Sequence, residues 1–270
     1  MPNHKSSSLF HYTRSLKVVK SILSKGFEPC YCIEEYSYTD LGNNKTQYFL
    51  GIPMVCFCDI PLSCAHKHQK KYGEYAIVLS KEWAIKKGVN PIFYNYNKSL
   101  IGEIDQLKHS KEIIDMANKS KENIWASLCI HNNEVARHKL LGFVKNIENN
   151  LFDEYYYENE WRYILEPKIT IGIGEMFPKS YKWLYGEDAQ LLKGKDYKKR
   201  RMYGDYLKNS YLTFDINDIK SIIVPKEMDV TRCIKMLDKL NVICGKSIAK
   251  DEKAELYTKV TSIERIRKDF

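Results

Sequence analysis

The sequence lacks the features that would place it in a membrane or in the common nucleotide-binding folds. No apolar run approaches the roughly 20 residues that an α-helix needs to cross a bilayer. The first six residues, MPNHKS, lack the apolar core of a secretion signal, so we expect a cytoplasmic protein without a membrane partner. No G-x-G-x-x-G or Walker-type loop occurs, which argues against Rossmann and P-loop folds. The clustered Asp, Glu and Lys residues of a metal-dependent nuclease are missing too, and that function ranks last.

Cysteine is present but does not indicate a disulfide scaffold, since a chain of 270 residues without a secretion signal is too long for that class. Two C-x-C pairs, Cys30/Cys32 and Cys56/Cys58, together offer four thiolates to a structural zinc ion. Both pairs lie in apolar segments typical of strands, where cysteine packs as a small hydrophobic residue. We therefore expect reduced, buried cysteines, and zinc binding is the alternative.

Two histidine patterns resemble metal-binding spacings but are expected to hold no metal. His66 and His68 form an H-x-H pair before a basic segment, which favours a loop or the start of a helix near the substrate entrance. His131 and His138 are seven residues apart with Glu134 between them, and this spacing is expected to give a solvated helix face.

The remaining composition is that of a folded domain with a moderate positive charge. Hydrophobic residues make up 44% and aromatic residues 13%, which excludes a disordered chain, and the net charge of +9 favours an anionic partner. The strongest local source of this charge is the basic segment 193–201, in which tyrosines are interleaved or adjacent. Aromatic rings stack on bases while cations bind phosphates, so this segment is a candidate for binding single-stranded nucleic acid; a solvated loop is the alternative. The candidate contacts are Lys195, Lys198, Lys199, Arg200 and Arg201.

The pattern of apolar residues predicts an α+β fold, in which helices interrupt a mixed or antiparallel sheet. Ser15 is expected to cap a first helix that Gly26 ends. The polar stretch 36–46 is expected to form a loop or hairpin turn. Further helices are expected at 83–87 and 230–240, and strands at 8–12, 53–61, 75–79, 91–94, 155–165, 169–173, 212–214 and 218–224.

We expect a single domain that spans residues 1–270 and carries two additions. Residues 98–150 have apolar side chains at helical spacing, and neither Gly nor Pro interrupts 103–141, which predicts a helical insertion of two or three helices. Residues 212–270 are expected to form a C-terminal strand–helix extension.

The segment 155–165 has one polar and one apolar face if it forms a strand. Side chains alternate along a strand, so Glu158, Glu160 and Arg162 share one face, while Trp161 and Tyr163 share the other and should pack on the core. Cross-strand ion pairing on an exposed strand would explain the polar face. A strand anchored on its apolar side is equally a suitable platform for a catalytic carboxylate.

A second candidate segment, Phe10-His11-Tyr12-Thr13, ends the first expected strand just before the first helix. A histidine and a hydroxyl side chain at such a strand end can hold a ribose-bearing ligand. Together with the segments 52–62, 72–75 and 158–163, it resembles the AbiGi-type abortive-infection proteins of bacteria over roughly residues 8–230. More distantly, the order of a His-Tyr-Thr motif, a helix, strands and a late glutamate resembles DarT-like ADP-ribosyltransferases, which transfer ADP-ribose from NAD to a nucleobase. The toxin of CmdTAC-type phage-defence systems, which modifies mRNA, is a related possibility.

The resemblance to the transferases implies an ADP-ribosyltransferase-like sheet core with NAD as the substrate. His11 would hold the NAD ribose with Thr13 beside it, and Tyr75 or Tyr72 would stack on the nicotinamide. Arg14 or Arg162 would bind the pyrophosphate, because a guanidinium binds phosphate with two hydrogen bonds. Tyr12 alternates to the face opposite His11 and is expected to lie in the core. DarT-like enzymes carry an arginine after the second strand, and here that region offers only lysines and histidines between residues 66 and 71.

The same resemblance assigns the catalytic step to the late glutamates. Glu160 would stabilise the ribosyl cation and remove a proton from the acceptor, with Glu158 as its substitute and Arg162 beside it. These roles require Glu160 to meet His11 across one cleft.

Two functions of different classes follow. The first is an NAD-consuming ADP-ribosyltransferase toxin of an abortive-infection system, which modifies nucleic acid, RNA rather than DNA, and which an antitoxin or chaperone chain restrains. The second is a catalytically inactive, antitoxin-like interaction protein. Growth arrest on expression that His11→Ala or Glu160→Gln relieves would distinguish the first from the second.

Overall fold

The computed structural model describes residues 7–39, 45–61, 65–95, 136, 139–146, 158–165, 184–185, 189–190, 192 and 207–269. The strands in these residues are β1 (Ser8–Thr13), β2 (Cys30–Thr39), β3 (Lys45–Cys58), β4 (Tyr75–Ser80), β5 (Asn90–Pro91), β6 (Phe93–Asn95), β7 (Val144–Asn146), β8 (Glu160–Ile164), β9 (Leu184–Tyr185), β10 (Ile219–Val224), β11 (Val242–Ile243), β12 (Lys246–Ser247) and β13 (Val260–Ser262). The helices are α1 (Leu16–Lys25), α2 (His66–Tyr72), α3 (Lys81–Lys86), the 3₁₀ turn η3 (Ile216–Asp218), α10 (Glu227–Asp238), α11 (Lys250–Thr258) and α12 (Ile263–Asp269).

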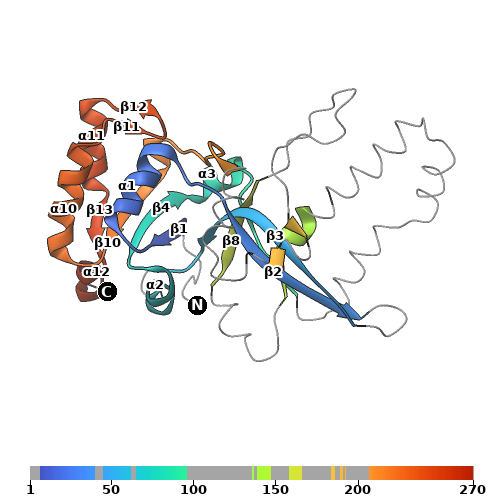
Figure 1. The fold of residues 1–270 in the computed structure, drawn as a ribbon. Coiled ribbons are helices and arrows are strands. Elements are labelled where there is room, and N and C mark those ends of the chain that lie inside the picture. Colours follow the sequence, from blue (N-terminus) through green and yellow to red (C-terminus); the bar gives the residue numbers. More distant parts are fainter. Residues whose placement is uncertain are drawn as a thin grey trace, which may run out of the picture.

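Nine of the described strands form one sheet in the order β13-β10-β4-β1-β3-β8-β5, with β2 and β9 also paired to β3 (Figure 1). Neighbouring strands are antiparallel, except that β10 and β13 are parallel. The helices α10 and α11 gather at the β10–β13 end of the sheet, and the long β2–β3 hairpin extends from the opposite end. The expected α+β fold with a mixed or antiparallel sheet is confirmed.

Local signals position the first strand and helix as expected. The Ser15 hydroxyl accepts a hydrogen bond from the Val18 amide at 3.4 Å, which caps α1. Gly26 ends the helix with a φ of +102°, and a Cβ at this position would lie 2.8 Å from the Leu212 carbonyl oxygen. The glycine therefore allows the chain to turn closely against Leu212. The strand expected at 212–214 is reduced to an isolated β-bridge between Leu212 and Phe27.

Three other expectations need correction. The strand expected at 53–61 is the second half of β3, which pairs with β2 from Lys45 onward. The expected strand 91–94 is split between β5, in the main sheet, and β6, which pairs with β7. The short helix starts at Lys81, because the Ser80 hydroxyl accepts from the Trp83 amide at 3.1 Å and caps it two residues early. Most of the helical insertion at 98–150 and the strand at 169–173 lie outside the described residues.

The central strands have two faces, which the pairing register defines. Phe10 lies opposite Cys58, and Cys58 lies opposite Glu160, so these three share what we term the glutamate face, together with Tyr12. His11 and its neighbours on the other side form the histidine face, made up of Leu9, His11, Val55, Phe57 and Trp161.

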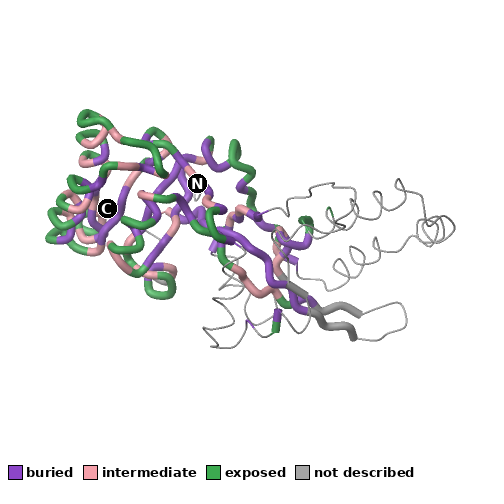
Figure 2. The backbone as a smooth tube through the Cα atoms, turned by 45° about the horizontal axis from the view of Figure 1, so that its top comes forward, coloured by how far each residue is buried: buried purple, intermediate pink, exposed green. Residues whose placement is uncertain are grey.

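Each face packs against different helices, and the central strands are buried between them (Figure 2). Helices α1, α3 and α10 cover the histidine face with Leu23, Trp83 and Leu237 among their buried side chains. The glutamate face packs against Ala65, at the start of α2, and against Ile263 of α12.

Candidate functional site

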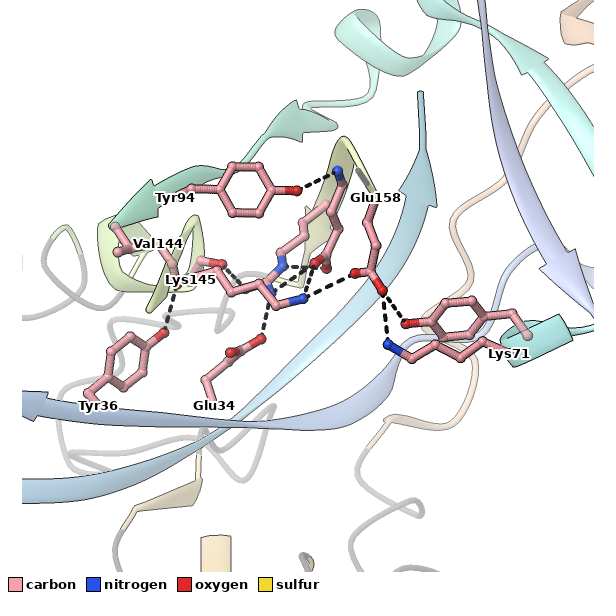
Figure 3. Close-up of polar contacts among 11 residues, drawn as sticks. Glu34, Tyr36, Lys71, Tyr94, Val144, Lys145 and Glu158 are labelled. Carbon is pink, nitrogen blue, oxygen red and sulfur yellow. Dashed lines mark hydrogen bonds and ion pairs between the residues drawn. The ribbon is translucent and has the colours of Figure 1, made fainter. Parts of the chain in front are cut away.

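Six charged side chains gather on the glutamate face where β8 meets β2, β7 and α2 (Figure 3). We term this set the buried charge cluster, and its members are Glu34, Lys71, Lys145, Glu158, Glu160 and Arg162. The three carboxylates and the three cations balance in formal charge. All of the expected catalytic residues are therefore brought together. Glu160 and Arg162 share a face of β8, as the alternation along the strand predicts, whereas Glu158 lies before the strand, across Asn159 with its positive φ of 40°.

Arg162 is the centre of the cluster and is almost fully buried, with 1% of its surface exposed. Its Nε donates to Glu160 Oε1 at 2.7 Å and its Nη1 donates to the Gly142 carbonyl at 2.8 Å. Its Nη2 donates to Glu34 and, at 3.3 Å, to the second oxygen of Glu160. Burial opposes the charged guanidinium, but the Glu34 and Glu160 carboxylates raise the pKa of Arg162. Every nitrogen of the side chain is engaged within the protein.

Glu160 is held as an ionised carboxylate. Burial would raise its pKa, but Arg162 and Lys145 outweigh burial and lower the pKa of Glu160 to about 2. Lys145 donates to its Oε2 at 2.9 Å, and Arg162 contacts both oxygens. The backbone amide of Glu160 donates a hydrogen bond to the Tyr94 hydroxyl at 3.1 Å.

Glu158 occupies the outer side of the cluster. Its Oε1 accepts from Lys71 at 3.0 Å and from the Tyr72 hydroxyl at 3.2 Å, and its Oε2 accepts from Lys145 at 3.3 Å. Lys145 thus bonds both Glu158 and Glu160. The sequence analysis names Glu158 as a substitute for Glu160, and the structure places the two carboxylates at different positions in one network.

The β2–β3 hairpin and β7 supply the residues that the sequence analysis missed. The Tyr36 hydroxyl donates to the Leu141 carbonyl at 2.7 Å, which holds the segment that carries Gly142 and Lys145 against β2. Glu34 is a charged position on a strand face that otherwise carries Cys32 and Tyr36. That exception to an apolar alternation is the signal by which Glu34 could have been found.

His11 lies on the opposite side of the sheet from this cluster. Its ring packs edge-on against Phe27 and Phe57, with centroid distances of 4.9 and 5.7 Å, and its Nδ1 lies 2.9 Å from the Cys56 carbonyl oxygen. Burial lowers the pKa of His11, with the carbonyl bond opposing. The expectation that His11 and Glu160 meet across one cleft is wrong, because the register places them on different faces of β1, β3 and β8. Tyr12 is buried, as expected, but on the glutamate face, where its ring lies 5.3 Å from that of His68.

The other residues expected to bind NAD lie on the histidine face or line a pocket. Thr13 is buried at the end of β1 on the histidine face, opposite Tyr75 of β4. Tyr75 packs partly against the core of that face and also lines a pocket with Arg14. The expected nucleic-acid contacts Lys195, Lys198, Lys199, Arg200 and Arg201 lie outside the described residues.

The two C-x-C pairs lie in β2 and β3, as expected, and all four cysteines are free thiols. Cys58 is buried, but Cys30 is exposed at the first position of β2, so the expectation of burial is wrong there. Within the described ranges, no three His, Cys, Asp or Glu side chains are arranged to hold a metal ion. His66 and His68 belong to α2, which agrees with the expected helix start. No helix in this part of the chain is long and apolar enough to span a membrane.

Comparison with known proteins identifies the family. The family described as "Putative abortive phage resistance protein AbiGi, antitoxin" matches residues 25–225. The "Abortive phage resistance protein AbiGi" of Lactococcus lactis subsp. cremoris is 26% identical in an alignment 272 residues long. The alignment covers 90% of this chain and 99% of the relative. No solved structure matches the chain. Since the family match covers well over half of its length, the protein belongs to the AbiGi family of abortive phage resistance proteins.

Proposed function

We propose that the protein acts in abortive phage resistance as an antitoxin-like interaction protein, which binds a toxic partner chain and catalyses no reaction of its own. The description of its family as an antitoxin supports the class of function. The separation of His11 from Glu160 by the thickness of the sheet carries the proposal, because a transferase site built on these two residues would need both on one side.

The bonding of Glu160 supports the same conclusion. A carboxylate that stabilises a ribosyl cation must have an oxygen available to the substrate, whereas both oxygens of Glu160 accept bonds from Arg162 or Lys145. A carboxylate with a pKa near 2 is also a weak general base at neutral pH. We infer that the cluster stabilises the junction of β2, β7 and β8.

The competing function is an ADP-ribosyltransferase toxin with an ADP-ribosyltransferase-like fold, which would consume NAD and modify RNA. The clustering of Glu158, Glu160 and Arg162 on one face is the observation in its favour. In that case Glu160 would have to exchange one of its cations for the substrate.

Labelled NAD distinguishes the two functions. Purified protein is incubated with NAD labelled in the adenylate phosphate and total cell extract, and the products are then treated with nuclease or protease. We expect no transfer of label above the background without protein, equally for wild type, Glu160→Gln and the surface variant Lys86→Gln. Label that enters a nuclease-sensitive product and disappears only in Glu160→Gln would overturn the proposal.

A growth assay tests whether the protein neutralises a toxic partner chain. Expression of this chain alone should not arrest growth, whereas co-expression with the toxic chain of the same abortive-infection locus should restore growth to cells that the toxin arrests. Glu160→Gln should reduce this rescue only as far as it reduces the amount of folded protein. Growth arrest by this chain alone would contradict an antitoxin role.

A further inference from the structure

A pocket of about 490 Å³ lies where the β1–α1 turn, α2, the turn before β4 and α12 meet. The pocket is distinct from the buried charge cluster, although Lys71 lines the pocket and also pairs with Glu158 of the cluster. Its lining residues are Arg14, His66, Gln69, Lys70, Lys71, Gly73, Glu74, Tyr75 and Arg267. Segments from both ends of the chain therefore build one concavity, on the side of the molecule where α2 and α12 lie (Figure 1).

Two features of the fold bring the cations of this pocket together. Gly73 has a φ of +119°, and a Cβ there would lie 2.2 Å from the Thr13 carbonyl oxygen and 2.8 Å from the Cα of Arg14. Only glycine permits this approach, which sets Arg14 beside the end of α2. On the other wall, buried Gln69 accepts a hydrogen bond from Arg267 Nη2 at 3.0 Å, which directs a residue of the last helix toward the pocket.

The lining carries a clear excess of positive charge. Arg14, Lys70, Lys71 and Arg267 are cations, and Glu74 is the one carboxylate among the lining residues. Lys71 is paired with Glu158. Within the described part of the chain, Arg14, Lys70 and Arg267 form no ion pair. Three cations of the lining thus lack an ion pair among the described residues, and together with Glu74 they give the pocket a net positive charge.

We propose that this pocket binds a ligand through a di- or triphosphate group. Three cations from three separate segments line the pocket, and two or three linked phosphates offer oxygens to more of them at once than a single phosphate does. Two of the cations are arginines, whose planar guanidinium binds phosphate oxygens in pairs. The volume lies in the range of small-molecule sites, about 300–1,000 Å³, and the cations converge on one concavity, which favours a compact ligand over an extended strand. The site is separate from the antitoxin role proposed above and does not depend on it.

Calorimetric titration of the full chain tests the proposal, with inorganic pyrophosphate, ADP, ATP and adenosine as probes at low salt. We expect saturable binding of the three phosphate compounds and none of adenosine. Arg14→Ala and Arg267→Ala should each weaken binding about tenfold or more, because each removes charge-assisted hydrogen bonds to phosphate. Lys86→Ala removes the same charge from an exposed position on α3, away from the pocket, and should leave the affinity unchanged. Tighter binding of ADP than of pyrophosphate would identify a nucleotide as the source of the phosphates, and equal affinity would identify the phosphate group alone.

Three results would overturn the proposal. The first is the absence of saturable binding by every phosphate compound. The second is an equal loss of affinity in Lys86→Ala and in the two arginine variants, since this would indicate general attraction to a positive surface. The third is binding of adenosine as tight as that of ADP.

Discussion

Replacement of Arg162 by methionine should be the most damaging single change in the buried charge cluster. Methionine has a similar length but no charge, so Glu34 would lose its ion pair and Glu160 would keep only Lys145. Loss of one partner from a buried ion pair costs about 3–5 kcal/mol, because the remaining charge is uncompensated. A domain has a total stability of roughly 5–15 kcal/mol, so the variant should lie close to the limit of folding.

Urea unfolding, followed by tryptophan fluorescence, measures this loss. Trp83 and Trp161 both pack in or against the core of the histidine face and should report its disruption. The matched control is Lys71→Met, which removes a cation of the same cluster whose side chain is 43% exposed. Exposed ion pairs contribute about 0.2–1 kcal/mol, so the control should lose no more than that. Addition of Glu160→Gln to Arg162→Met should recover part of the loss, because it removes one unpaired carboxylate. A loss below about 1 kcal/mol for Arg162→Met, or one equal to that of Lys71→Met, would refute a structural role for the cluster.

Two further predictions concern α2 and the glycine that follows it. Gly73→Ala should destabilise the protein by more than about 1 kcal/mol in urea unfolding, because its Cβ would overlap the Thr13 carbonyl; Gly88→Ala is the control, since Gly88 also has a positive φ of +75° but no atom within 4 Å of the added Cβ. A smaller loss at Gly73 than at Gly88 would show that the close approach is not needed. Burial lowers the pKa of His68 to about 4, from the ordinary value near 6.5, against the opposing charge of Glu158. The unfolded chain then binds more protons between pH 6.5 and 4, so this contribution to stability is complete above pH 6.5 and is lost as the pH falls toward 4. His68→Gln should flatten that part of the curve of unfolding free energy against pH, and an unchanged curve would contradict the assignment.

Elements with local signals could be predicted from the sequence. Ser15 and Gly26 bracket α1 through a cap and a left-handed stop, and the alternating strand that ends at Thr13 directly precedes it. The alternation along β8 likewise predicted that Glu160 and Arg162 share a face and that Trp161 lies on the other. Such signals depend on residues a few positions apart in the sequence, so they do not require knowledge of the tertiary contacts.

The partners of β8 could not be predicted, because they come from distant segments. Glu34 and Lys145 are 126 and 15 residues from Glu160, and tertiary contacts such as the pairing of the β2–β3 hairpin, the Tyr36 hydrogen bond and the pairing of β6 with β7 bring them to it. The sequence therefore predicted a polar face on β8 but not that this face is buried and charge-balanced. Arg267 is a similar case, since it lines the same pocket as Arg14 and its hydrogen bond to Gln69 joins residues 198 positions apart.

The assignment of His11 and Glu160 to one site was wrong because the register of the strands places them on opposite faces of the sheet. Short sequence motifs do not specify that register. Phe10, Cys58 and Glu160 lie side by side on three adjacent strands, so His11 would reach the glutamate face only after a shift of β1 by one residue against β3. That shift would also turn Leu9, which is fully buried, out of the core beneath α1 and α3, and would bring Phe10 and Tyr12 into its place. No rotation of a side chain achieves the same result. The separation of the two residues is therefore a property of the core itself, and a ligand that reaches Glu160 would meet Tyr12, His68 and Tyr72 on its side of the sheet, and not His11.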